Sequence, residues 1–140
     1  GYRVEAIDGS VEMCRAATAL TGLPVRQMLF RELDEKEKYD GIWACSSILH
    51  LPKTELVEVL EKMRAALKPS GIIYASFKYG DFEGNRRGRY FTDLTEGAIA
   101  EIIERAGGLK IEKMWITDDA RPERRGEKWL NIILRKKIIY

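Results

Sequence analysis

The sequence predicts an α/β fold, with a mostly parallel sheet, helices on both faces and an antiparallel hairpin at the C-terminal end. Short β-prone segments alternate with segments of helical periodicity, and two of the strands are almost entirely apolar. The last two strands follow each other without a helix between them. The 140 residues, 45% of them hydrophobic, suffice for a buried core and predict a single domain over residues 1–140.

The chain begins with a predicted strand, helix and strand. Tyr2–Asp8 is β-prone, and Ser10 is the expected N-cap of a helix whose apolar positions keep helical spacing as far as Gly22. Val25–Phe30 is the next predicted strand. The charged run 31–38 is expected to be a solvated loop.

The middle of the chain repeats this order. Gly41–Cys45 is nearly all apolar, which is typical of a strand covered on both faces. Leu56–Leu67 has the most regular helical spacing in the sequence, and the turn Lys68–Gly71 is expected to end that helix before a buried strand, Ile72–Phe77. Lys78–Asp93 is polar and aperiodic, so it is predicted to be a long loop with a functional role.

The last third predicts a helix and a hairpin. Thr95 is the expected N-cap of a helix that ends at Gly107. Leu109–Thr117 and Lys128–Lys136 are predicted strands, joined by the charged connection 118–127. The three tryptophans fall within strands and are expected in the core: Trp43, Trp115 and Trp129.

Composition excludes several classes of protein. With 24 basic and 22 acidic residues the net charge is +2, too small for the broad positive field of an RNA-binding protein. No apolar run reaches the roughly 18 residues of a membrane helix. Cys14 and Cys45 lie in apolar segments without metal-type spacing, so we expect no disulfide framework, no metal site and a cytoplasmic location, with Cys45 a buried structural thiol.

Candidate binding residues stand at the ends of the predicted strands. Asp8, Glu32, Ser46 and Lys78 each follow or close a strand, and ligands of parallel sheets bind at that edge. Asp8 could accept hydrogen bonds from the two hydroxyls of a ribose, or pair with a helix N-terminus. Glu32 could accept from the amine of an adenine with Leu33 against the ring, or be a solvated side chain.

Several segments carry a resemblance to a known family. YRVEAIDGS, FREL, YDGIWACSSILHLP and LKPSGIIYASF, in this order, resemble the class I S-adenosylmethionine-dependent methyltransferases, which have a Rossmann-like fold. Within that class, GIWACSSILHL and GRYFTDLTEG are most similar to the small tellurite-resistance-type branch. The resemblance extends from Tyr2 to Lys136.

The resemblance implies S-adenosylmethionine as cofactor and assigns roles to residues. Asp8 would bind the ribose, Gly9 and Ser10 would pass beneath the adenosine, and Glu32 with Leu33 would border the adenine. The residues that would line the methionine end are Ala44, Cys45 and Ser46. Ile48–His50 would begin the wall that faces the methyl acceptor.

The chain departs from the family at its start. Such enzymes open with a strand, a glycine-rich turn and a helix, whereas this sequence begins at their second strand and contains no G-x-G-x-G-like turn. We therefore expect the domain to be N-terminally incomplete, lacking the first strand and helix. The strand edges left open would be closed by a longer natural chain or by another subunit of a homo-oligomer.

The candidate catalytic residues are His50, Arg89 and Tyr90. His50 could remove a proton from the acceptor, or be a hydrogen-bonding residue at a helix entrance. The basic and aromatic residues of the long loop suggest a lid over a small anionic acceptor, or else an exposed loop: Arg86, Arg87, Arg89, Tyr90 and Phe91. A second anion contact is offered by Arg121, Arg124 and Arg125.

The preferred interpretation is methyl transfer to a small molecule. A non-catalytic adenosyl-binding or scaffold module is the alternative from another class. A nicotinamide-dependent oxidoreductase would share the acid at Asp8 but leaves the SSILHL segment unexplained.

Overall fold

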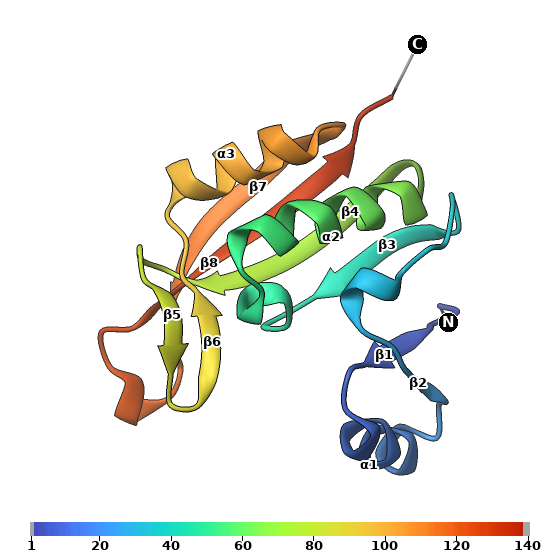
Figure 1. Cartoon of the computed structure of the whole chain (residues 1–140), viewed down its shortest axis with the longest axis horizontal. Coiled ribbons are helices and arrows are strands. Elements are labelled where there is room, and N and C mark those ends of the chain that lie inside the picture. Colours follow the sequence, from blue (N-terminus) through green and yellow to red (C-terminus); the bar gives the residue numbers. More distant parts are fainter. Residues whose placement is uncertain (1, 139–140) are drawn as a thin grey trace. The chain divides into compact units, whose positions relative to one another are not determined.

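The computed structural model of the chain describes residues 2–138. The chain divides into two compact parts, the first ending at Leu33 and the second beginning at Asp34, and each is described by itself (Figure 1). Within the described residues, no helix combines the length and the apolar character needed to cross a membrane.

The first part is a small β-α-β unit. Strand β1 (Ala6–Asp8) pairs in parallel with β2 (Val25–Gln27), and helix α1 (Val11–Thr21) connects them. The predicted caps are confirmed: the Ser10 hydroxyl accepts from the backbone N–H of Met13 at 3.3 Å, and Gly22 ends the helix in the left-handed conformation, with φ 72°.

Both strands of this part are shorter than predicted. The chain leaves β2 at Gln27 and forms a 3₁₀ turn, η1 (Phe30–Glu32), where the sequence predicts continued strand. The Glu32 carboxylate accepts a hydrogen bond from the Leu29 backbone N–H at 2.8 Å, which satisfies a donor that a longer strand would have paired. This local bond explains the early end of β2.

The second part is built on a four-stranded sheet in the order β3-β4-β8-β7. Strand β3 (Tyr39–Ala44) runs parallel to β4 (Leu67–Lys78), as expected of strands joined through helix α2 (Lys53–Ala66). Strand β7 (Leu109–Asp118) pairs antiparallel with β8 (Lys128–Lys136), which confirms the predicted hairpin.

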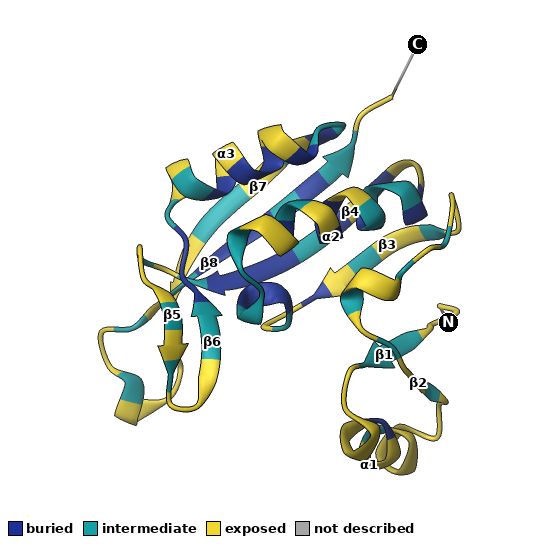
Figure 2. Cartoon of the chain, in the orientation of Figure 1, coloured by how far each residue is buried: buried dark blue, intermediate teal, exposed yellow. Residues whose placement is uncertain are grey.

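Helix α2 and helix α3 (Glu96–Ala106) lie on the same face of this sheet (Figure 1). The core lies between them and the strands, where the buried side chains of β4 and β8 concentrate (Figure 2). Its largest fully buried members include Leu56, Leu60, Ile73, Phe77, Ile99 and Leu130. The second helical layer that the sequence predicts on the other face is not formed within residues 34–138.

The opposite face of the sheet corrects two predictions. Trp43 is 75% exposed and stacks on Tyr74, with ring centroids 4.3 Å apart, so it is not a core residue. Cys45 is exposed rather than a buried structural thiol, whereas Cys14 is buried. Both errors have one cause, because β3 is an edge strand with helices on a single face within this part.

The segment predicted to be a loop, 78–93, contains a hairpin. Strands β5 (Glu83–Arg86) and β6 (Arg89–Thr92) pair antiparallel around a two-residue turn in which Arg87 and Gly88 have φ of 55° and 81°. Strand β4 also begins earlier than predicted, at Leu67, because the turn expected to separate it from α2 is drawn into an irregular pairing with β3.

Candidate functional site

A pocket of about 710 Å³ opens at the carboxyl ends of β3 and β4. Cys45 and Ser46 follow β3, and Ser76 and Lys78 belong to the last residues of β4. The β5–β6 hairpin and the connection between β7 and β8 supply the remaining walls. Its position at this edge of a parallel strand pair is where ligands of α/β folds bind.

The turn after β3 is held by a hydrogen bond from the neighbouring strand. Ser46 adopts a left-handed conformation, with φ 48°, which is costly for a residue other than glycine. Its backbone N–H donates to the hydroxyl of the buried Ser76 at 2.8 Å. This bond fixes the backbone that leads from β3 into the pocket.

A polar network forms part of the pocket floor. The Tyr74 hydroxyl donates to the Asn131 carboxamide oxygen at 2.6 Å, and the Asn131 amide donates to the Thr117 hydroxyl at 3.1 Å. Burial raises the pKa of Tyr74, so the phenol stays protonated. The network satisfies a buried amide and leaves the Tyr74 ring as a wall.

His50 lies in the pocket in a defined tautomer. Its Nδ1 is 2.8 Å from the backbone carbonyl oxygen of Tyr90, which can only accept, so Nδ1 carries the hydrogen and Nε2 keeps a lone pair. Burial lowers the pKa of His50 below 6.5, and the charges of Arg89 and Lys78 act in the same direction against the bond to Tyr90. A neutral imidazole with an available Nε2 is a suitable general base.

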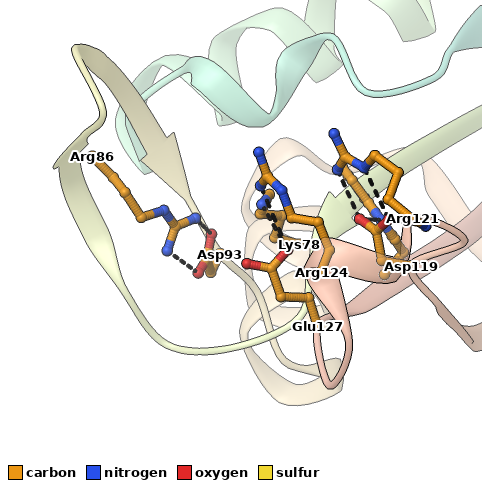
Figure 3. A network of polar contacts seen from close by, with 8 residues as sticks. Lys78, Arg86, Asp93, Asp119, Arg121, Arg124 and Glu127 are labelled. Atoms are coloured by element: carbon orange, nitrogen blue, oxygen red, sulfur yellow. Dashed lines mark hydrogen bonds and ion pairs between the residues drawn. The ribbon is translucent and has the colours of Figure 1, made fainter.

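Two arginines of the pocket are tied to carboxylates of their own (Figure 3). Arg86 makes a two-pronged contact with Asp93, at 3.1 and 3.0 Å. Asp119 accepts from Arg121 Nε at 3.0 Å and from the Trp129 indole at 3.0 Å. The bonds from Arg121 hold the pKa of Asp119 far below its usual range, so the carboxylate stays charged.

Two further cations of the pocket share one carboxylate. Lys78 and Arg124 lie 3.6 and 3.5 Å from the same Glu127 oxygen (Figure 3). Burial lowers the pKa of Lys78, whose ammonium lies over the rings of Phe91 and Trp129. Two positive charges therefore share the single negative charge of Glu127, which leaves one of them unbalanced.

The cofactor-binding candidates of the first part engage in local bonds. Asp8 Oδ1 accepts from the Ser10 backbone N–H at 2.8 Å, and the Gly9 carbonyl accepts from Gln27 at 3.2 Å. Glu32 uses Oε1 for the Leu29 bond, and Leu33 follows η1. Each carboxylate keeps its second oxygen for another partner. That these residues contact a cofactor stays a prediction.

The candidates of the second part gather more closely. Cys45, Ser46, His50 and Arg89 all line the pocket, and the buried Ala44 ends β3 beside them. Tyr90 contributes its carbonyl to His50, while its hydroxyl donates to Glu83 at 2.7 Å. Among the described residues, no group of His, Cys, Asp or Glu is arranged to hold a metal ion.

Sequence reasoning missed several residues of the pocket. Tyr74 and Ser76 were not singled out; they alternate along β4 with Lys78, which the sequence had placed at this edge, so all three project on the pocket face of the sheet. That period-two pattern in IIYASFK was the available signal. Asn131 and Asp119 gave none, because their partners come from distant parts of the chain or from the fold of the β7–β8 connection.

Comparison with known proteins identifies the class of protein. Residues 1–71 match the model of a methyltransferase domain family, and they make up just over half of the 140 residues. The chain therefore belongs to this methyltransferase family. No curated protein matches it.

Solved structures agree with the family. The N1-methyltransferase for 1,6-didemethyltoxoflavin from Burkholderia thailandensis, solved with that compound and S-adenosylhomocysteine, is 25% identical with a TM-score of 0.78. The match covers 99% of this chain and 63% of that enzyme, so the chain spans less than two thirds of it.

Two further structures are similar in fold. A methyltransferase from Methanosarcina mazei is 14% identical, with a TM-score of 0.84 over 99% of this chain and 84% of its own. The [4+2]-cyclase SpnF is 15% identical, with a TM-score of 0.71 over 95% of this chain and 66% of its own. Because one of these proteins is a cyclase, similarity of fold does not define the reaction, which depends on the residues of the site.

Proposed function

We propose that the chain is part of an S-adenosylmethionine-dependent methyltransferase that methylates a small anionic molecule. The observation that carries the proposal is the pocket beside the Cys45–Ser46 turn, in which a neutral His50 faces several cations. The family match supports the cofactor class. The GIWACSSILHL and GRYFTDLTEG segments favour the small tellurite-resistance-type branch.

The residues present fit the cofactor. Asp8 Oδ2 can accept a hydrogen bond from a ribose hydroxyl while Oδ1 accepts from the Ser10 backbone N–H. Glu32 and Leu33 would border the adenine, and the residues from Ala44 to Ser46 would hold the methionine end. S-adenosylmethionine supplies a methyl group bonded to a positively charged sulfur, and this sulfur is the leaving group when a nucleophile attacks the methyl carbon in line.

The chain's own residues then bind and deprotonate the acceptor. His50 Nε2 takes the proton that the nucleophilic atom loses, and the Tyr90 carbonyl stabilises the resulting imidazolium through Nδ1–H. Arg89 and the other cations of the pocket attract and orient an anionic acceptor. Tyr90 positions the base, because its backbone carbonyl contacts His50 Nδ1 and its hydroxyl donates to Glu83.

We also propose that an open strand edge in each of the two parts pairs with a further strand. Strand β1 pairs only with β2, and β3 only with β4, among the described residues. Each therefore leaves one edge unpaired, which natural sheets avoid. A further strand, for example from a second copy of the chain, would pair with these edges.

Calorimetric titration with S-adenosylhomocysteine tests the proposed cofactor site, on this chain and on a form extended at its N-terminus. We expect the extended form to bind, and Asp8→Ala to lose about 1.5–3 kcal/mol of binding free energy, the range of a charge-assisted hydrogen bond. Glu12→Ala, which removes an exposed acid of α1, is the matched control. Binding by neither form would favour the non-catalytic scaffold.

A further inference from the structure

We infer that Lys78 and Arg124 form a binding site for an oxyanion, a carboxylate or a phosphate, carried by the methyl acceptor. The inference rests on the proposed function and makes it more specific, because it places the charged end of the acceptor at one wall of the pocket.

The two cations line the large pocket, whereas their carboxylate partner does not. Lys78 and Arg124 line the large pocket, whereas Glu127 lines a smaller adjoining pocket of about 290 Å³ together with Lys78. Figure 3 shows the three side chains converging, with both cations directed toward the Glu127 carboxylate. An anion in the large pocket can therefore reach Lys78 and Arg124 without displacing Glu127.

The charges in this cluster do not balance. Arg86 and Arg121 each have a carboxylate at 3.1 Å or less, but Lys78 and Arg124 share Glu127 at 3.5 Å or more. The Lys78 side chain is 12% exposed, so water cannot screen its charge well. A bound oxyanion would supply the missing negative charge at short distance.

The surroundings suit an oxyanion attached to a carbon skeleton. The rings of Phe91 and Trp129 flank the Lys78 ammonium at 5.5 and 5.8 Å, and both line the large pocket. Apolar atoms of an acceptor can pack on these rings while its oxygens contact the two cations. His50, which packs edge-on against Phe91 at 4.7 Å, then lies beside the body of the acceptor.

Direct titration with small anions tests the site without cofactor or turnover. Benzoate, phenyl phosphate and the uncharged benzamide are added at low ionic strength, and binding is followed by calorimetry and by tryptophan fluorescence, to which Trp129 contributes. We expect at least one anion to bind and benzamide to bind at least ten times more weakly. The preferred anion distinguishes a carboxylate from a phosphate site.

Three variants separate a binding role from a structural one. Lys78→Gln should weaken anion binding at least tenfold, and Lys78→Arg should retain it within about threefold. Glu127→Gln should strengthen binding, because it removes the competing negative charge. As a control, Lys110→Gln removes an exposed positive charge of β7 outside the pocket lining, and should change affinity less than threefold.

The signs of these effects decide the outcome. If Lys78 only holds the fold through its ion pair, Lys78→Gln and Glu127→Gln break the same contact and shift the affinity in the same direction. That result would overturn the inference, as would failure of the wild-type chain to bind either anion. Because no cofactor is present, failure of the proposed methyltransferase activity would leave the anion titration unchanged.

Discussion

Replacing Ser76 by alanine would release the turn that leads from β3 into the pocket. The Ser76 hydroxyl accepts from the Ser46 backbone N–H at 2.8 Å, and Ser46 is in the left-handed region with φ 48°. A left-handed conformation costs a residue other than glycine roughly 1–2 kcal/mol. The hydrogen bond from β4 helps to offset that cost, so its loss should destabilise the turn.

The size of the effect follows from the burial of Ser76, which is 3% exposed. Losing the bond and leaving the Ser46 N–H poorly satisfied should lower the free energy of unfolding by about 1–3 kcal/mol. Ser46→Gly removes the penalty of the left-handed conformation and lets the turn relax. In that background Ser76→Ala should therefore cost less, with a coupling of about 0.5 kcal/mol or more.

Urea unfolding followed by tryptophan fluorescence measures these energies in the second part of the chain, where all three tryptophans lie. Ser47→Ala, on the same turn, is the control and should change stability by less than about 0.5 kcal/mol. Equal costs of Ser76→Ala in the wild-type chain and in the Ser46→Gly variant would refute the argument, since the hydrogen bond would then not support the strained backbone.

Three further predictions concern the pocket and its hairpin. The pKa of His50 lies below 6.5 in the folded chain, so its contribution to the free energy of unfolding is complete above pH 6.5 and falls as the pH drops toward the folded pKa. In urea melts measured over a series of pH values, His50→Gln should remove this loss of stability at low pH. An unchanged pH profile would contradict the prediction. Asp93→Ala leaves Arg86 without its carboxylate and should cost about 3 kcal/mol in the same assay, whereas a change below about 1 kcal/mol would mean that the pair is only a surface contact. A Cβ added at Gly88 meets no atom within 4 Å, so the expected cost of Gly88→Ala, about 1–2 kcal/mol in thermal or urea unfolding, measures backbone strain alone. No loss of stability would show that the hairpin turn tolerates a side chain.

The helices and the C-terminal hairpin could be predicted because their signals are local. Ser10 and Thr95 cap helices as the sequence indicates, and the apolar spacing of Leu56–Leu67 identifies the buried face of α2. Strand extents were less predictable. The lengths of β2 and β4 depend on the Glu32 bond and on pairing with β3, neither of which has a sequence pattern.

The β5–β6 hairpin was missed for a physical reason. Its turn, Arg87-Gly88, places a large side chain in a left-handed conformation where asparagine, aspartate or glycine is usual. The contact between Arg86, beside the turn, and Asp93, which follows β6, supports the hairpin and has no signal in a local pattern.

The sequence by itself determined the order of the helices and of the strands outside the β5–β6 hairpin, because periodicity is written in neighbouring residues. The candidate residues Cys45, Ser46, His50 and Arg89 line one pocket, and their contact with a ligand stays a prediction. Only the tertiary structure decided the exposure of Trp43, the tautomer of His50 and the sharing of Glu127 by Lys78 and Arg124. The contacts of His50 with the Tyr90 carbonyl and of Lys78 with Glu127 join groups 40 or more residues apart, and contacts at such separations leave no trace in local spacing.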